Sequence, residues 1–209
     1  MDEDRMGDPT LTYTEASWNP VTMDDLNRSR PTVYRLSKKY AEKAAWEFVE
    51  NEKPGFDLAT VCPPLVLGPV VHHLATLDSI NTSNERVVEL LRGQWTSAIP
   101  GAGSVQFWVS VRDAARAHIL AMERPEAGGK RLFTTAGYFS NRGIVDTVRA
   151  NFPELEGKLP PKELKGGEGT PEDKSAKYDN SATVKALGIE WETFESSIID
   201  LVKSIKDRI

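Results

Sequence analysis

The order of two neighbouring segments constrains the fold most strongly. Residues 34–51 combine alanines with bulky apolar side chains, and Lys53-Pro54-Gly55 follows them, so we expect a helix that ends near Asn51. The apolar run from Leu58 to Leu67 comes next and leads into Gly68-Pro69, which is typical of a strand and the turn after it. A helix followed by an apolar strand and a turn is what the edge of a parallel sheet needs, so the chain is predicted to be α/β.

The same patterns predict the other elements. Helices are expected at residues 83–92, 113–123, 140–150, 179–188 and 193–206, and strands at 107–111 and 131–135. Residues 1–30 and 158–177 are rich in turn-forming or charged residues, so these segments are expected to be irregular, the second one a mobile loop.

Tyr34 and Lys38 are the first candidates for chemistry. Residues four apart share one face of a helix, so the phenol and the ammonium group should lie side by side. A nearby cation favours the phenolate and makes proton exchange with a carbonyl or an alcohol easier. A Tyr-x-x-x-Lys pair also arises by chance, and the alternative is an exposed aromatic residue beside a solvated lysine.

Five segments together carry a family resemblance. They are Glu15-Ala-Ser-Trp-Asn-Pro20, the helix that begins near Tyr34, Val61-Cys-Pro-Pro-Leu-Val-Leu-Gly-Pro69, Asn81-Thr-Ser83 and Val111-Arg-Asp-Ala-Ala-Arg-Ala-His118. In this order the chain resembles extended short-chain dehydrogenases/reductases (NAD-dependent epimerase/dehydratase-like), above all fungal methylglyoxal and carbonyl reductases and dihydroflavonol-4-reductase-like enzymes. The resemblance implies an oxidoreductase acting on CH–OH groups.

One part of the family pattern has no counterpart. The family begins with a glycine-rich turn between a strand and a helix, which binds the cofactor pyrophosphate. Neither Pro100-Gly-Ala-Gly-Ser104 nor Gly166-Gly-Glu-Gly169 fits that turn, and residues 1–14 contain no serine to match the family's catalytic one. We therefore expect the C-terminal part of a Rossmann-type NAD(P)-binding fold without its glycine-rich βαβ half. Residues 1–125 would be the remnant of the nucleotide-binding domain and part of the substrate cleft, and residues 126–209 a small mixed α/β substrate lobe.

The resemblance also implies site residues. Tyr34 would protonate the carbonyl oxygen, and Lys38 would assist it and bind the nicotinamide ribose. Pro63, Val66 and Ser83 match positions at the nicotinamide end of the cofactor, which is expected to be NADP(H), with NAD(H) as the alternative. From the residues alone, Pro63 and Val66 could equally pack at a strand end, and Ser83 could be a helix N-cap.

Composition and charge limit which partners, cellular environment and metal sites are expected for the chain. The net charge is -5 and no strip of lysine and arginine is present, which disfavours nucleic-acid binding. No apolar stretch has the length of a membrane span, and the single cysteine, Cys62, fits a reducing, cytoplasmic environment. His72 and His73 are adjacent and lack further ligands nearby, so no metal site is expected.

The function predicted from these observations is NAD(P)H-dependent reduction of a ketone or aldehyde of a small or secondary metabolite. Two alternatives stay open. The chain could be an inactive remnant that acts as a binding module and associates with itself through the face left by the missing half. It could also be a relative of the sugar-nucleotide epimerases and dehydratases, which share the Tyr-Lys pair.

Overall fold

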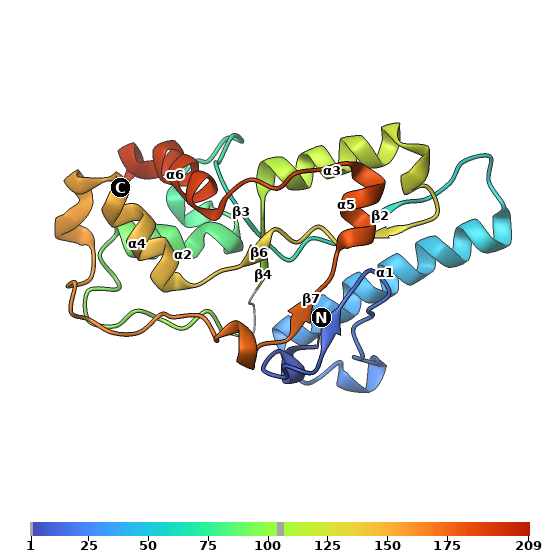
Figure 1. Cartoon of the computed structure of the whole chain (residues 1–209), viewed down its shortest axis with the longest axis horizontal. Helices are drawn as coiled ribbons and strands as arrows, with labels where there is room; N and C mark the ends of the chain where they lie inside the picture. Colours follow the sequence, from blue (N-terminus) through green and yellow to red (C-terminus); the bar gives the residue numbers. More distant parts are fainter. Residues whose placement is uncertain (1, 104–106) are drawn as a thin grey trace. The chain divides into compact units, whose positions relative to one another are not determined.

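A computed structural model of the chain describes residues 2–103 and 107–209. Helices and short strands alternate along it, which confirms the predicted α/β class (Figure 1). The helices are α1 Arg30–Glu52, α2 Thr82–Leu91, α3 Val111–Glu123, α4 Asn141–Asn151, α5 Ser181–Leu187 and α6 Phe194–Ile205. The strands are β1 Thr12–Tyr13, β2 Thr60–Val61, β3 Leu65–Leu67, β4 Phe107–Ser110, β5 Arg131–Leu132, β6 Gly137–Tyr138 and β7 Lys177–Tyr178.

The chain forms two compact units, each built from three segments. The first unit contains Met1–Cys62, Ala117–Phe133 and Glu172–Ile189. The second unit contains Pro63–Arg116, Thr134–Pro171 and Glu190–Ile209. The predicted division into residues 1–125 and 126–209 concerns functional domains rather than compact units, so it stays a prediction.

The first unit contains two small parallel strand pairs and the long helix α1. β2 pairs with β5, with Thr60 opposite Arg131, and β1 pairs with β7, with Tyr13 opposite Tyr178. Helix α1 begins after Ser29, whose hydroxyl accepts a hydrogen bond from the Thr32 amide at 3.2 Å. It ends at Lys53, which adopts a left-handed conformation with φ of 46°. The predicted end near Asn51 is thus confirmed, whereas the start lies one turn earlier than Tyr34.

The second unit has a three-stranded sheet covered by helices. β4 is the central strand, parallel to β3 and antiparallel to β6, and all four of its residues are buried. Helices α2, α4 and α6 supply much of one continuous apolar core, and α4 packs on α6 (Figure 1). The largest fully buried side chains of this core are Leu67, Val87, Leu90, Leu91, Ile144, Ile198, Leu201 and Ile205. The core explains why the apolar periodicity of residues 83–92, 140–150 and 193–206 predicted these helices closely.

The single strand predicted over residues 58–67 is wrong. The structure divides this stretch into β2 and β3, which pair with different strands, β5 and β4. Pro63 and Pro64 lie between them, and neither has an amide hydrogen to donate to a ladder. The two prolines therefore interrupt the strand completely.

A turn that requires glycine follows β3. Gly68 has φ of 142°, and a Cβ atom at this position would lie 2.7 Å from Cγ1 of Val111. The side-chain amide of Asn84 donates to the Gly68 carbonyl at 3.0 Å, which joins the start of α2 to this turn. The close approach of α3 and the bond from α2 fix where the chain leaves the sheet.

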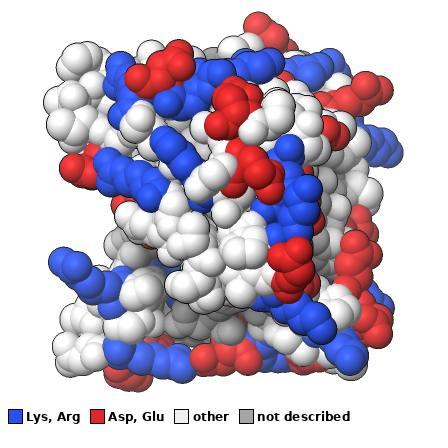
Figure 2. Space-filling model, turned by 90° about the vertical axis from the view of Figure 1, so that its left-hand side faces the viewer, with Lys and Arg blue, Asp and Glu red and all other residues white. Residues whose placement is uncertain are grey.

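The surface carries both signs of charge. On the face seen in Figure 2, Lys and Arg side chains are interspersed with Asp and Glu. In the part of the chain that the structure describes, no helix combines the length and the apolar character needed to cross a membrane.

Candidate functional site

Tyr34 and Lys38 lie next to each other near the start of α1, as their spacing predicts. The Lys38 ammonium nitrogen is 5.5 Å from the centre of the Tyr34 ring. The Ser37 hydroxyl donates to the Tyr34 backbone carbonyl at 2.8 Å, within the same turn. The Tyr34 side chain is 63% exposed, so a molecule from solution can reach its hydroxyl group.

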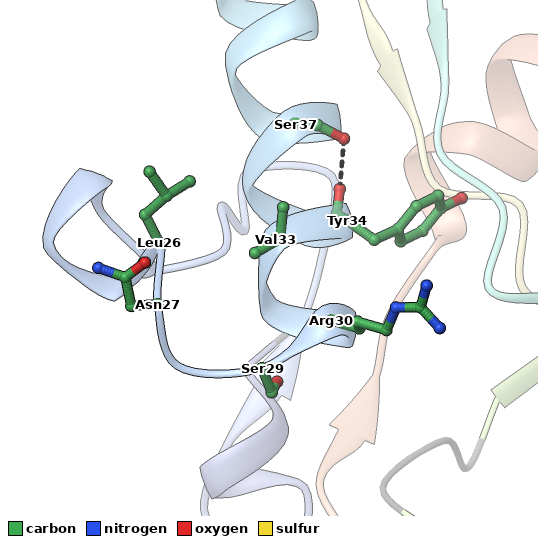
Figure 3. Close-up of a pocket in the computed structure, with 7 residues that line it drawn as sticks. All are labelled: Leu26, Asn27, Ser29, Arg30, Val33, Tyr34 and Ser37. Atoms are coloured by element: carbon green, nitrogen blue, oxygen red, sulfur yellow. Dashed lines mark hydrogen bonds between the residues drawn. The ribbon is translucent and has the colours of Figure 1, made fainter.

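A shallow pocket of about 520 Å³ lies at this end of α1. Seven residues line it: Leu26, Asn27, Ser29, Arg30, Val33, Tyr34 and Ser37 (Figure 3). Leu26 and Asn27 come from the turn before the helix, and the others come from its cap and first turns. The Tyr34 ring and the Arg30 guanidinium extend toward the same side of the helix in Figure 3. The pocket lining thus combines apolar side chains, Leu26 and Val33, with the polar residues Asn27, Ser29 and Ser37 and the cation of Arg30.

An ion pair holds α1 to the strands of the first unit. The Arg131 guanidinium donates to both carboxylate oxygens of Glu42, at 2.7 and 3.2 Å, and the Thr60 hydroxyl donates to the same carboxylate at 2.8 Å. Burial disfavours the charge on Glu42, but the bonds from Arg131 and Thr60 outweigh it and keep the pKa of Glu42 below its usual value. We call these three residues the Arg131 cluster.

The Arg131 cluster also fixes the loop before α1. Arg131 donates to the backbone carbonyls of Glu15 and Ser17, at 2.5 and 2.9 Å, and its guanidinium lies 4.0 Å from the Trp18 ring centre. The Glu15 carboxylate accepts bonds from the amide and the hydroxyl of Thr183, at 2.8 and 2.6 Å. The Glu15–Pro20 segment, chosen from the sequence as a family feature, therefore has a structural role in this unit.

Cys62 borders the Arg131 cluster. Its sulfur lies 3.9 Å from each carboxylate oxygen of Glu42 and 3.8 Å from a nitrogen of Arg131. Burial, followed by the nearby Glu42 charge, raises the pKa of the Cys62 thiol. A thiol held in its neutral form is a poor nucleophile, so Cys62 is suited to packing rather than to catalysis.

Sequence reasoning missed Glu42 and Arg131. Glu42 lies two turns after Tyr34 on α1, and its partner Arg131 is 89 residues further along the chain. No local signal marks the pair, because a glutamate on α1 needs a cation only where folding buries it, and Glu47, Glu50 and Glu52 of the same helix are exposed. The sequence does not reveal which cation that is.

Pro63, Val66 and Ser83 belong to the second unit. Pro63 is exposed just before β3, and Val66 is a half-buried residue within β3 that lies opposite Val109 of β4. Ser83 is half-buried in the first turn of α2, whose N-cap position is occupied by Asn81, so the alternative of Ser83 as an N-cap is wrong. The bond from Asn84 to the Gly68 carbonyl brings the first turn of α2 to the end of β3, and so brings Ser83 and Val66 to one region of this unit.

Arg112 and Asp113, from one of the five family-like segments, have structural partners. The Asp113 carboxylate accepts a bond from the Glu192 amide at 2.7 Å, and Arg112 forms an ion pair with Asp200. Asp113 is 2% exposed, and this burial raises its pKa, an effect that exceeds that of the bond from Glu192. Both residues connect the start of α3 to the segment around α6.

The described residues include no counterpart of the glycine-rich turn that binds a dinucleotide's phosphates. Tyr34 and Lys38 lie side by side on α1, but neither glycine-rich stretch, as far as it is described, opens a helix that could bind phosphate. Gly167 lies in the predicted loop, buried against Ile99, where a Cβ atom would be 2.1 Å from Cγ2 of Ile99. In the other stretch, Ser104 lies outside the described residues. In the second stretch, Gly166 and Gly167 lie close to Ile99 and Gly169 lies close to the Phe139 carbonyl, whereas a Cβ atom at Gly101 or Gly103 would meet open space.

Proteins of similar sequence are known. No model of a known protein family matches the chain. It is 40% identical to a ketoreductase of Aspergillus niger over 196 residues, which cover 94% of this chain and 57% of that protein. It is 33% identical to the NADPH-dependent methylglyoxal reductase of Saccharomyces cerevisiae over 200 residues, which cover 95% of this chain and 58% of the relative.

A solved structure shares the fold. The crystal structure of Gre2 from Candida albicans in complex with NADPH superposes with a TM-score of 0.84 at 31% identity, covering 100% of this chain and 61% of the other. The chain thus spans 57–58% of the length of the two curated relatives. The resemblance predicted from five short segments is confirmed: this chain belongs with the extended short-chain dehydrogenases/reductases and corresponds to the C-terminal part of their Rossmann-type fold.

Proposed function

We propose that the protein takes part in NADPH-dependent reduction of a small ketone or aldehyde, with Tyr34 as the proton donor. The observation that carries this proposal is the Tyr34–Lys38 pair, in which Tyr34 is exposed and lines an open pocket. The names of the relatives, a ketoreductase and an NADPH-dependent methylglyoxal reductase, support it. They also favour reduction over the epimerase or dehydratase alternative.

The proposed chemistry divides into two tasks. NADPH, when bound, supplies the hydride. The Tyr34 hydroxyl donates a hydrogen bond to the substrate carbonyl oxygen and transfers its proton to that oxygen as negative charge develops there. The Lys38 ammonium, one helical turn away, stabilises the phenolate that remains on Tyr34.

Pro63, Val66 and Ser83 are proposed to contact the nicotinamide end of the cofactor. In support, Val66 is the middle residue of β3, and the first turn of α2, which carries Ser83, is bonded through Asn84 to the turn that follows this strand. Residues 1–125 are proposed to be the remnant of the nucleotide-binding domain with part of the substrate cleft, and residues 126–209 the small substrate lobe. A cytoplasmic location is proposed because the one cysteine, Cys62, is a free thiol.

The first test is a fluorescence titration of the purified chain with NADPH and with NADH. Saturable binding, tighter for NADPH, is expected, and the absence of any binding would contradict the proposal. If binding is found, oxidation of NADPH is followed with small ketones and aldehydes. The Tyr34→Phe variant should lose at least about 100-fold in kcat, since general acid catalysis contributes about 10²–10⁴-fold. Unchanged turnover in a folded variant would remove Tyr34 from the mechanism.

One observation favours a second candidate function, that of a catalytically inactive binding module. Helix α1 has 23 residues, of which only Thr32 and Leu36 are buried, and it exposes several large apolar side chains. This candidate predicts strong binding of a hydrophobic dye or self-association by the purified chain, without cofactor binding. A monomer that does not bind the dye would speak against it.

A further inference from the structure

One arginine of the second unit is half-buried without an acidic partner. Arg86 lies on α2, and among the described residues no carboxylate forms an ion pair with it. Three other half-buried arginines do form ion pairs, at 2.7, 3.8 and 3.2 Å: Arg131 with Glu42, Arg142 with Glu168, and Arg149 with Glu156. A charge that is withdrawn from water and left uncompensated is costly, so the position of Arg86 calls for an anionic partner from outside the chain.

Two residues around the start of α4 hold the Arg86 guanidinium in place. Its central carbon lies 5.1 Å from the centre of the Phe139 ring, and its Nη1 donates to the side-chain oxygen of Asn141 at 3.0 Å. Asn141 is 2% exposed, and its amide nitrogen donates to the carbonyls of Pro100 and Gly101, at 2.9 and 3.3 Å. These bonds direct its oxygen toward Arg86. The guanidinium is therefore positioned before any ligand arrives, which lowers the entropic cost of binding.

One edge of this guanidinium is unused. Nε of Arg86 is buried without a hydrogen-bond partner, and Nη2 donates to no residue in the described part of the chain. Nε and Nη2 lie on the same side of the guanidinium, where an arginine can bind both oxygens of a carboxylate. The nearby Glu89 does not fill this edge, because its carboxylate accepts a bond from the Trp95 indole at 3.2 Å. Burial lowers the pKa of Arg86, and the charge of Glu89 offsets this effect only in part.

We propose that the Nε–Nη2 edge of Arg86 binds the carboxylate of an oxo-acid substrate, which makes Arg86 a specificity-determining residue. The inference rests on the proposed function, in which Ser83 contacts the nicotinamide end of the cofactor. Ser83 and Arg86 are three residues apart on α2, so they share one helical face and their Cβ atoms are about 5–6 Å apart. A ketone that receives hydride beside Ser83 therefore reaches Arg86 with its carboxylate when a few carbon atoms separate the two groups.

Isothermal titration calorimetry of the unaltered chain with 4-oxopentanoate and with its methyl ester tests the need for a carboxylate. Both compounds carry the same ketone, and only the first carries a negative charge. We expect the acid to bind about 30-fold more tightly, because hydrogen bonds between charged groups are among the strongest in proteins. The titration is made without cofactor, since Arg86, Phe139 and Asn141 all belong to the second unit. Equal affinities for the two compounds, or no binding of the acid, would overturn the proposal.

This outcome is separate from that of the proposed function. Binding of 4-oxopentanoate without any oxidation of NADPH would leave the role of Arg86 intact and contradict the reductase. Oxidation of NADPH by neutral ketones, together with equal affinities for the acid and its ester, would do the reverse.

Three variants assign the carboxylate to Arg86. Arg86→Met keeps an unbranched side chain and removes the guanidinium, so it should weaken binding of 4-oxopentanoate about 30-fold and abolish the preference over the ester. Arg86→Lys keeps the charge without the paired donors and should weaken binding of the acid less than Arg86→Met does. The matched control is Arg92→Met, which removes an exposed arginine at the other end of the same helix and should leave the dissociation constant unchanged.

Circular dichroism verifies the fold of each variant, and the comparison of acid and ester in the unaltered chain remains decisive if Arg86→Met does not fold. A preference for the acid that survives in folded Arg86→Met would overturn the proposal. So would weaker binding of NADPH by Arg86→Met with unchanged binding of 4-oxopentanoate, because Arg86 would then bind a phosphate of the cofactor.

Discussion

The two units differ in what holds their longest elements in place. In the second unit, β4 is buried along its whole length, and α2, α4 and α6 bury apolar side chains in one core. In the first unit, the longest helix of the protein buries only Thr32 and Leu36, and half-buried polar groups of the Arg131 cluster connect it to β2 and β5. A helix that carries reactive groups can thus be fixed by a few directional bonds while most of its surface stays open.

The largest expected effect comes from a cavity in the second unit. Leu90 of α2 is 0% exposed, and Leu90→Ala should lower the free energy of unfolding by about 3 kcal/mol, through lost burial and the space left behind. Urea denaturation followed by circular dichroism measures it. Val71→Ala, at an exposed position of the same unit, should change the value by less than about 0.5 kcal/mol. Equal losses in both variants would show that the core is not the main source of stability in this unit.

The next effect is expected in the first unit. Arg131→Ala leaves the Glu42 carboxylate half-buried without its cation and should cost about 2 kcal/mol. It also frees the loop at Trp18, so the tryptophan fluorescence should change in the folded variant. Lys130→Ala alters a neighbouring exposed residue and serves as the control. If Arg131→Ala and Lys130→Ala have the same stability, the Arg131 cluster does not hold α1.

Acid should affect the two units in opposite directions. The folded pKa of Glu42 lies below its usual 4.5, so its contribution is complete above that pH and disappears as the pH falls through the folded value. Burial raises the folded pKa of Asp113 above its usual 3.8, so its contribution is complete below pH 3.8 and is lost as the pH rises through the folded value.

Denaturation curves at several pH values, recorded for Glu42→Gln and Asp113→Asn, test these signs. Glu42→Gln should reduce the loss of stability in acid, and Asp113→Asn should reduce the loss toward neutral pH. A shift in the same direction for both variants would contradict the contrast between the units.

Helix caps should show the smallest effect and no difference between the units. Ser29 caps α1 and Ser140 caps α4, each through a bond from the amide three residues later, at 3.2 and 2.9 Å. Replacing either by alanine should cost about 1 kcal/mol, because the bond is local. Thermal denaturation measures both losses. If the two losses are equal, the units differ in the packing of their helices and not in how the helices are capped. A much larger loss for one cap would mean that its surroundings, rather than the bond, set the value.

The helices could be predicted well because their signals are local. Ser140 is the N-cap at which α4 begins, and Gly188, where φ is 57°, is the C-cap at which α5 ends, so each signal adjoins the helix whose bound it sets. The strands were predicted less well. The two-residue strands β1, β6 and β7 carry too few residues for a pattern, and the interruption between β2 and β3 depends on partners that are distant in sequence.

The sequence by itself determined the α/β class, the family and the position of Tyr34 beside Lys38, because a helical spacing of four residues and five ordered motifs need no tertiary information. Only the tertiary structure revealed the pair of Glu42 and Arg131, the close approach that requires Gly68, and the exposure of most of α1. These features depend on contacts between segments far apart in the chain. Burial and charge compensation are properties of the folded surface, which no local stretch of sequence specifies.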